Sequence, residues 1–375
     1  MTETILFLHS SAGRYGADRQ LLALAAGLDR ERFTPVAVLP ERGDLAALLE
    51  GDGVETVVAP LTVLRRAELG PRAAAGLLRP DVRELESLAR ARGAALVHSN
   101  TSVIASGHRL AGRLGVPHVL HVRELYPRVA LAWPLWRRRL LAADRVLCVS
   151  HAVAAQFSGS ENVAVVHDGL AHAPRRGERS AARAALGLDQ DTFAVAVLGR
   201  VSAWKGQDVL ARALAEPPLA SIGAVGLVAG APWPGAERPL AELDRMRDTL
   251  GLGERLRMLG FEDDLDTLLG AVDAVAVPST RPDPFPNAAL EAAAAGVPVV
   301  AAAHGGLPEM VRDGDTGLLV EPGSPRALAS ALRSLADDPA RAAALGTAAA
   351  ADVTSRFSAE RMLAAVNAQY DALLR

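Results

Sequence analysis

The sequence contains one cysteine, Cys148, among 375 residues, so it can form neither a disulfide within the chain nor a cysteine-rich metal site. It has no run of about 18 or more apolar residues free of charges and turn residues, which a membrane-spanning helix needs. It also lacks a basic excess, because 40 Lys and Arg stand against 43 Asp and Glu. A general nucleic-acid-binding protein would carry such an excess, so that class is excluded.

Several motifs of catalysis and targeting are missing as well. The sequence has no HExxH, no phosphate-binding P-loop, no GxSxG and no cluster of His and Cys at metal-binding spacing. We therefore expect no metal and no bound cofactor. The N-terminus has no basic segment ahead of an apolar one, so we expect no signal peptide and a cytoplasmic protein.

Half of the residues are hydrophobic, and the length suffices for two domains of ordinary size. In the first half, short apolar runs bounded by Gly, Pro, Ser or Asn alternate with helical patterns, which is typical of a parallel, doubly wound sheet. The predicted strands are residues 5–9, 35–39, 54–59, 95–99, 118–121, 146–149 and 163–166, and the predicted helices are residues 18–28, 44–50, 82–92 and 104–114.

The same alternation restarts at residue 193. The predicted strands are residues 193–198, 224–229, 256–259, 274–277, 297–301 and 318–320, and the predicted helices are residues 207–215, 240–250, 265–271, 288–295, 325–335 and 339–350. The fold class is therefore α/β, with two doubly wound, Rossmann-like domains, and a ligand that bridges them would lie in the cleft between them.

The domain boundaries follow from composition. We predict an N-terminal domain at residues 1–170, a polar, Arg-rich linker at residues 171–186 and a C-terminal domain at residues 187–354. Residues 355–375 form an amphipathic helix, which we expect to pack back on the N-terminal domain. Its apolar stripe contains Met362, Val366, Tyr370 and Leu373.

Residues 277–309 contain the clearest indication of a ligand site. An apolar strand ends at Pro278-Ser279, a loop rich in Pro and Asp follows, and a helix begins near Asn287, which is a good N-cap. The Gly305-Gly306 turn, after the next strand, allows backbone to approach a ligand closely. The carboxyl ends of parallel strands are where ligands bind, and free N–H groups at a helix start favour an anion.

Two cations follow the strand at residues 193–198. Gly199-Arg200 comes directly after the strand, and Lys205 lies five residues beyond Arg200, just before a helix. Arg can bind two oxygens at once and Lys acts as a point charge, so the pair suits a diphosphate. Taken alone, the motif fits a solvated loop with ordinary surface charges equally well.

Two carboxylates frame the helix start near Asn287. Asp283 lies in the loop and Glu291 lies inside the helix. Carboxylates bind vicinal sugar hydroxyls well, so we interpret both as hydroxyl-recognition groups, at the opposite end of the ligand from a phosphate. The alternative for Glu291 is simple stabilisation of the helix N-terminus.

The N-terminal half gives weaker signals. Gly13 and Gly16 lie in the loop between the first strand and helix, where a plain turn is the alternative to a phosphate contact. His98 and His121 fall at the ends of neighbouring strands, which favours a cleft lining, although a lone His is usually structural. Residues 133–139, WPLWRRR, could contact a membrane surface or an anionic acceptor; a packed helix with a solvated Arg face is the commoner outcome.

Together these motifs resemble the retaining glycosyltransferases of the GT-B fold, family 4 (group 1). The segment from Asp283 to Glu291 resembles the E-x7-E motif of that family, and GGLPE at residues 305–309 resembles the stretch that follows it. Gly199-Arg200 with Lys205 is similar to its phosphate-binding pair, and the segment around Gly16 to its first helix.

The resemblance implies a role for each matching residue. Arg200 and Lys205 would hold the donor diphosphate, Glu291 the ribose, and Asp283 the transferred sugar, while His121 would line the sugar pocket. The catalytic set would be His121, Arg200, Lys205 and Asp283, and the further donor-binding set would be Gly13, Gly16, Gly199, Phe261, Phe285, Asn287, Ala288 and Glu291.

The implied function is retaining, metal-independent transfer of a hexose-type sugar from a nucleotide-diphosphate sugar, with UDP favoured and GDP next. The acceptor would be a hydroxyl group of a glycan, a lipid-linked intermediate or a small natural product, carried by the N-terminal domain. The alternatives are a non-catalytic nucleotide-sugar-binding protein and a nucleotide-sugar epimerase. Asp283 in place of Glu, and Pro286 in place of the usual Gly, depart from the family pattern in the pocket for the transferred sugar.

Overall fold

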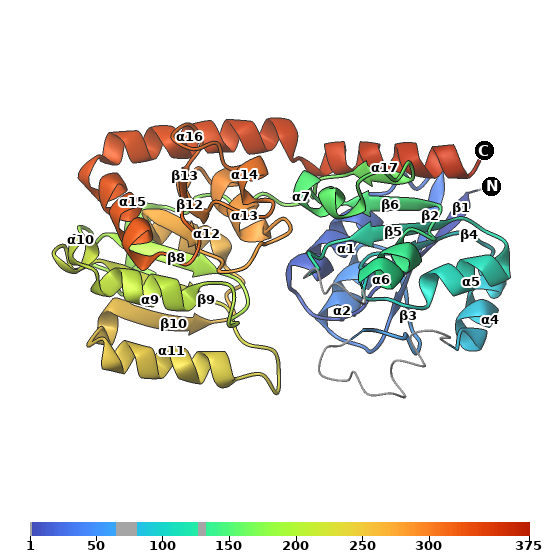
Figure 1. Ribbon diagram of the computed structural model, residues 1–375, viewed down its shortest axis with the longest axis horizontal. Coiled ribbons are helices and arrows are strands. Elements are labelled where there is room, and N and C mark those ends of the chain that lie inside the picture. Colours follow the sequence, from blue (N-terminus) through green and yellow to red (C-terminus); the bar gives the residue numbers. More distant parts are fainter. Residues whose placement is uncertain (1, 65–80, 127–132) are drawn as a thin grey trace. The chain divides into compact units, whose positions relative to one another are not determined.

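The computed structural model describes residues 2–64, 81–126 and 133–375 (Figure 1). The chain divides into two compact units. The N-terminal unit is Met1–Ala171 with Ser358–Arg375, and the C-terminal unit is His172–Phe357. Each unit contains its own parallel sheet with helices around it, so the predicted α/β class with two doubly wound domains is confirmed.

The sheet of the N-terminal unit has seven strands in the order β3-β2-β1-β4-β5-β6-β7, and every pairing between them is parallel. Consecutive strands run outward from β1 in one direction and from β4 in the other, so the strand order reverses between β1 and β4. The strands are β1 (Glu3–Leu8), β2 (Phe33–Leu39), β3 (Glu55–Val58), β4 (Ala94–Ser99), β5 (His118–Val122), β6 (Arg145–Cys148) and β7 (Val163–Val165).

The helices of this unit include one from the far end of the sequence. In order they are α1 (Gly16–Ala26), α2 (Asp44–Gly51), α4 (Arg83–Ala91), α5 (Gly107–Leu114), α6 (Trp133–Leu140), α7 (His151–Ala154) and α17 (Ala359–Leu373). Helix α17 contributes buried Met362, Val366 and Tyr370 to the core that also contains Ile5 and Phe7 of β1. The Tyr370 hydroxyl lies 2.6 Å from Nδ1 of buried His98, so the helix also satisfies a polar group of the sheet.

The sheet of the C-terminal unit has six parallel strands in the order β10-β9-β8-β11-β12-β13. Here the order reverses between β8 and β11, and in such sheets ligands bind at that point, beyond the carboxyl ends of the strands. The strands are β8 (Ala194–Leu198), β9 (Val225–Ala229), β10 (Leu256–Gly260), β11 (Ala274–Val277), β12 (Val299–Ala302) and β13 (Leu318–Val320).

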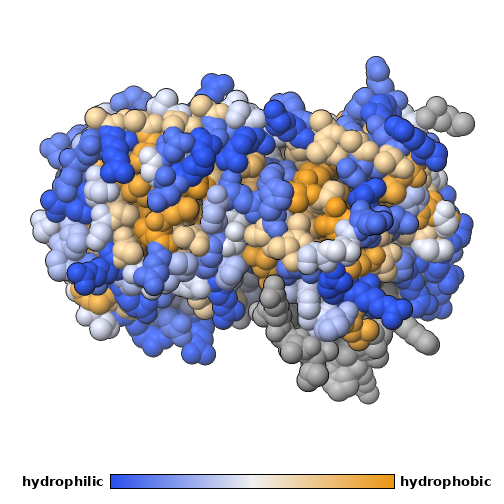
Figure 2. Space-filling model, turned by 45° about the horizontal axis from the view of Figure 1, so that its top comes forward, coloured by the Kyte–Doolittle hydropathy of each residue, from blue (hydrophilic) through white to orange (hydrophobic). Residues whose placement is uncertain are grey.

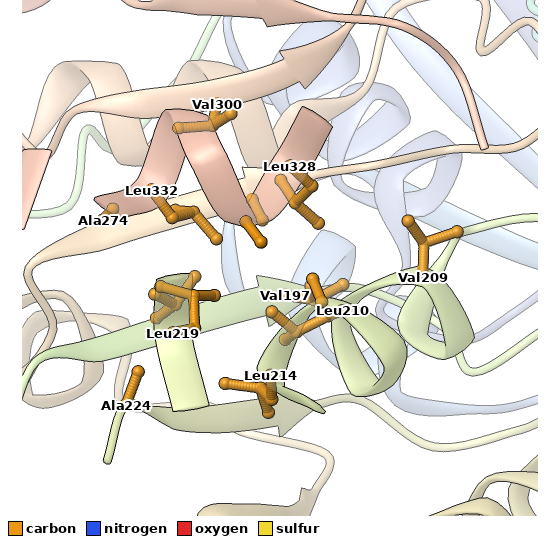
Figure 3. Packing of buried hydrophobic residues seen from close by; sticks show 14 of the residues in the cluster. Val197, Val209, Leu210, Leu214, Leu219, Ala224, Ala274, Val300, Leu328 and Leu332 are labelled. Atoms are coloured by element: carbon orange, nitrogen blue, oxygen red, sulfur yellow. The ribbon is translucent and has the colours of Figure 1, made fainter. Parts of the chain in front are cut away.

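The larger helices of this unit pack on the sheet through aliphatic side chains. Leu328 and Leu332 of α15 point toward Val197 of β8 and Leu210 of α9, and all four are buried (Figure 3). The helices are α8 (Arg179–Ala185), α9 (Gln207–Ala215), α10 (Pro217–Ala220), α11 (Arg238–Thr249), α12 (Leu265–Ala271), α13 (Asn287–Ala294), α14 (Leu307–Met310), α15 (Pro325–Asp337) and α16 (Pro339–Arg356).

The prediction that residues 171–186 form a linker between the domains is wrong. The segment contains helix α8, and it lies inside the C-terminal unit, which begins at His172. The Glu178 carboxylate caps the helix by accepting hydrogen bonds from the Ser180 and Ala181 amides. Arg183, in the middle of the helix, is fully buried, so a residue that looks like part of a solvated segment belongs to the core.

Candidate donor site

The loops that follow β8 and β11 meet at the point where the strand order reverses. Gly206, at the end of the β8 loop, has φ of 81°, and a Cβ there would overlap the carbonyl oxygen of Pro278 in the β11 loop. The Thr280 amide donates to the Trp204 carbonyl at 2.8 Å. The two loops are therefore in backbone contact, which only glycine at position 206 permits.

This contact brings together two predicted site residues. Lys205 Nζ lies 2.7 Å from Asp283 Oδ2, and the Asp283 side chain is 5% exposed against 22% for Lys205. The Ser279 hydroxyl donates to the same carboxylate oxygen at 3.2 Å. The sequence interpretation put these groups at opposite ends of a ligand, whereas in the structure they are paired with each other. Which part of a ligand each group contacts stays a prediction.

Lys205 has one further distinction in the sequence. It is the only lysine, and the remaining basic residues of the 40 are all arginine. Every basic position other than 205 is therefore occupied by arginine. An ammonium group is a compact point charge, whereas guanidinium is planar and larger, which fits a requirement for a small cation beside Asp283.

The Gly305-Gly306 turn supports the Asp283 loop. Gly305 has φ of 62°, and a Cβ on it would overlap the Asp283 backbone; the Gly306 amide donates to the Asp283 carbonyl at 2.8 Å. His304 Nε2 lies 2.8 Å from the Ser279 carbonyl oxygen. In the structure, the backbone of this turn closely approaches the loop that contains Asp283. The two glycines therefore help to fix the position of the Asp283 backbone.

Helix α13 begins beside Asp283. Its N-cap is Pro286, with φ of −75°, so Asn287 is the first helical residue and not the cap that we predicted. Proline fits a helix entrance because its φ is already close to helical, but it supplies no N–H. Phe285 and Glu291 are each 6% exposed, and Glu291 lies in the second turn. Ala288 is half-buried near the helix start.

The remaining predicted donor residues lie along the same edge of the sheet. Gly199, with φ of 112°, comes directly after β8, and Phe261, 37% exposed, follows β10. The Arg200 guanidinium carbon lies 3.9 Å from the centroid of the Trp233 ring, and Lys205 Nζ lies 4.6 Å from that of Trp204. The sequence interpretation gave neither tryptophan a role: Trp204 lies between the two cations of the motif, and Trp233 lies outside every motif.

In the N-terminal unit, the loop after β1 is organised by a buried carboxylate. Asp18, 2% exposed, accepts hydrogen bonds from the Ser11 hydroxyl at 2.6 Å and the Tyr15 amide at 2.8 Å, and its Oδ1 lies 2.8 Å from His9 Nε2. Burial acts to raise the pKa of Asp18, but these hydrogen bonds and the His9 charge outweigh it and lower the pKa below its usual value.

The predicted glycines lie on this loop. A Cβ on Gly13 would be 3.4 Å from Oδ2 of Asp18, and Gly16 is the first residue of α1. Gly13 is therefore next to the buried carboxylate, and Gly16 is at a helix N-terminus, where backbone N–H groups favour an anion. Their contact with a donor stays a prediction.

His121 is fully buried within β5. Burial is the main cause that holds its pKa well below the usual value, and Arg123 adds to the effect, so the imidazole is neutral. The Arg123 guanidinium lies 2.5 Å from both oxygens of Asp168 and donates to the Asn100 carbonyl at 3.0 Å. A place for His121 in a sugar pocket stays a prediction. Asp168, which follows β7 in the chain, is the ion-pair partner of Arg123, and the sequence interpretation did not identify it.

Helix α6, predicted as a contact for a membrane or an anionic acceptor, is tied to its own unit. Arg137 donates to the Gln156 and Ser158 carbonyls, and Arg139 donates to the Ala105 carbonyl. Trp133 packs against Phe157 at 6.0 Å between ring centroids. Membrane contact stays a prediction.

Among the described residues, no helix is both long and apolar enough to cross a bilayer. The face shown in Figure 2 has hydrophobic residues interspersed with hydrophilic ones.

Each of the two units matches a known protein family. Residues 178–352 match the family described as glycosyl transferases group 1, and residues 15–172 match glycosyltransferase family 4. The D-inositol 3-phosphate glycosyltransferase of Streptomyces scabiei is 36% identical over 309 residues, which cover 74% of this chain and 68% of that protein. The chain belongs to glycosyltransferase family 4.

Other family members match over less of their length. The D-inositol 3-phosphate glycosyltransferase of Mycolicibacterium paratuberculosis is 39% identical over 236 residues, covering 62% of this chain and 51% of that protein. The matches thus span about half to two thirds of these relatives.

Solved structures confirm the GT-B fold. HepE of Anabaena, solved in complex with UDP-glucose, has a TM-score of 0.84 at 28% identity, covering 99% of this chain and 100% of that one. Sucrose-phosphate synthase of Thermosynechococcus elongatus has a TM-score of 0.76 at 22% identity, with 99% of each chain covered, and shares the fold.

Proposed function

We propose that this protein transfers a hexose-type sugar from a UDP-sugar to a hydroxyl acceptor, with retention of anomeric configuration and without a metal. The observation that carries the proposal is the Lys205–Asp283 ion pair at the β8/β11 edge. It puts a phosphate-binding cation and a hydroxyl-binding carboxylate 2.7 Å apart, as a sugar bonded to a phosphate requires. HepE, at 28% identity, was solved with UDP-glucose, which supports a UDP-sugar donor over a GDP-sugar.

In this mechanism Arg200 and Lys205 bind the diphosphate and stabilise the negative charge that develops on the departing UDP. Each charge-assisted hydrogen bond contributes about 1.5–3 kcal/mol. Glu291 accepts hydrogen bonds from the ribose, and Asp283 accepts them from the transferred sugar. The acceptor hydroxyl attacks from the side of the leaving group, and the leaving phosphate oxygen takes its proton.

The names of the relatives suggest a chemical class for the acceptor. Their names give inositol 3-phosphate, a phosphorylated polyol, and we propose a polyol or sugar hydroxyl bound by the N-terminal unit in the cytoplasm. At the strand ends of that unit, the half-buried Ser10 hydroxyl accepts a hydrogen bond from Thr101 at 3.1 Å, and we assign its own O–H to such a ligand.

Two variants test the donor site. Lys205→Ala and Glu291→Ala should each lower UDP-sugar-dependent transfer by orders of magnitude, with melting temperature as the control for folding. A thermal-shift screen of UDP-, GDP-, ADP- and dTDP-sugars selects the donor beforehand, because a bound ligand raises the melting temperature. Near-wild-type transfer by both variants would refute the site, and donor binding without transfer or hydrolysis would favour a non-catalytic binding protein.

A further inference from the structure

Both tryptophans of the C-terminal unit lie against a cation of the donor site. The sequence has four tryptophans, and the two in His172–Phe357, all of which the structure describes, are Trp204 and Trp233. Trp204 is a chain neighbour of the lysine it contacts. Trp233 is instead brought to Arg200 from a different loop, the one after β9, with 3.9 Å between the guanidinium carbon and the ring centroid.

The backbone fixes the position of the Trp233 loop. The Gly199 amide donates to the Ala229 carbonyl at 2.9 Å, and the Val201 amide donates to the Ala231 carbonyl at 3.2 Å. Gly230 has φ of 157°, and a Cβ on it would overlap the Gly199 carbonyl. The loops after β8 and β9 are therefore packed backbone to backbone. Trp233 comes two residues after Ala231, the last residue of this backbone contact.

The other end of the contact is a long side chain on a fixed backbone. The Arg200 carbonyl accepts a hydrogen bond from Gln207 Nε2 at 3.0 Å, which fixes the main chain at this residue. An arginine side chain has about 2 kcal/mol of rotamer entropy to lose on binding an anion. Restricting it beforehand reduces that loss and so strengthens binding.

A cation over an aromatic ring is suited to this purpose. A guanidinium that stacks on a ring does so through its face, which leaves the N–H donors in its plane for phosphate oxygens. We propose that Trp233 is a positioning residue that orients the Arg200 guanidinium toward the donor diphosphate. The inference rests on the proposed function and deepens it, since it assigns part of the affinity for the donor to a residue outside the family motifs.

The test measures the affinity of the full-length protein for UDP and for uridine by calorimetry, in wild type, Trp233→Ala, Trp233→Phe, Arg200→Ala and the Trp233→Ala/Arg200→Ala double variant. Trp233→Ala should weaken UDP about three- to tenfold and leave uridine within about twofold, because only UDP carries the diphosphate. Trp233→Phe keeps an aromatic face and should recover most of the loss. In the Arg200→Ala background, Trp233→Ala should have no further effect, because its action passes through the guanidinium.

Transfer kinetics give a second readout. Trp233→Ala should lower kcat/KM for the UDP-sugar by at least a similar factor and Trp233→Phe should recover most of it, since Arg200 binds the diphosphate in the bound donor and in the transition state. Unchanged UDP affinity in Trp233→Ala, equal weakening of UDP and uridine, or a full effect in the Arg200→Ala background would each overturn the proposal. A wild-type protein that binds no nucleotide at all would instead overturn the proposed function.

Discussion

Lys205 Nζ lies 2.7 Å from Asp283 Oδ2, so the only lysine of the sequence is paired with the carboxylate assigned to the transferred sugar. The two residues are 78 positions apart and come from the loops after β8 and β11. A donor phosphate that enters this site must share the ammonium group with Asp283. The same carboxylate therefore weakens phosphate binding while it favours a sugar, which can donate hydroxyl hydrogens to it.

Asp283→Asn should separate these two effects. It removes the negative charge beside Lys205, so UDP, which has no sugar, should bind about two- to fivefold more tightly. Transfer from a UDP-sugar should nevertheless fall at least tenfold, because the sugar loses a charged acceptor. Calorimetry with UDP and a transfer assay measure the two quantities, and weaker binding of UDP to the variant would contradict the prediction.

The single lysine gives a chemical test that needs no substitution. Acetylation with an amine-specific reagent should modify one side chain, Lys205, besides the N-terminal amine, and should abolish transfer because the cation is lost. UDP present during the reaction should protect both the lysine and the activity. Peptide mass spectrometry identifies the modified amines. Full activity of a protein acetylated at Lys205 would show that this cation is dispensable.

Gly206→Ala should destabilise the C-terminal unit more than Gly223→Ala does. Both glycines have positive φ, at 81° and 61°, but a Cβ on Gly206 would overlap the Pro278 carbonyl, while one on Gly223 meets nothing within 4 Å. We expect a loss of roughly 1–2 kcal/mol for Gly223→Ala and roughly 2–5 kcal/mol for Gly206→Ala. Urea unfolding measures the free energy of unfolding of both variants. Equal losses would show that the overlap with the Pro278 carbonyl adds nothing to the cost at position 206.

Stability should fall in mildly acidic solution because of buried histidines. Burial lowers the pKa of His118 to about 3 from its usual 6.5, with a smaller contribution from His108. Between those values the unfolded chain binds a proton that the folded chain does not, so stability decreases as pH falls below about 6.5. One such group contributes at most about 1.4 kcal/mol per pH unit.

His118→Gln removes this titration and keeps a polar group near the Ser99 hydroxyl, which lies 3.0 Å from His118 Nε2. Its urea midpoint should depend less steeply on pH than that of the wild type between pH 7.5 and 5. The comparison cancels the contributions of the other titrating groups. Parallel pH profiles for the two proteins would show that His118 is accessible to protons in the folded state.

The sheets were the most predictable part of the structure. Ala274–Val277 and Leu318–Val320 are strands with the predicted bounds, because strands buried on both faces appear in the sequence as continuous apolar runs between turn residues. Helix α8 was missed because Arg183 looks solvent-exposed by composition. Its burial is possible because the guanidinium donates hydrogen bonds to the carbonyls of Asp189, Ala271 and Thr192. No sequence pattern predicts these partners.

For the proposed donor site, the motifs selected the candidate residues, but the sequence did not predict the contacts between them. The spacing from Asp283 to Glu291 is local and could be recognised, whereas the Lys205–Asp283 pair depends on strand order, which brings β8 beside β11. The Trp233 contact depends on the backbone packing of Gly230 against Gly199. Contacts that require a particular tertiary arrangement have no signature within a short stretch of sequence.

Helix α17 has a consequence for biosynthesis. The C-terminal unit is one continuous stretch, so all of its residues precede helix α17 in synthesis. The core of the N-terminal unit stays open until Met362, Val366 and Tyr370 have emerged. A nonsense codon placed just after the C-terminal unit would therefore damage the opposite half of the protein, and the uncovered apolar face would make the truncated product a target for chaperones and proteases.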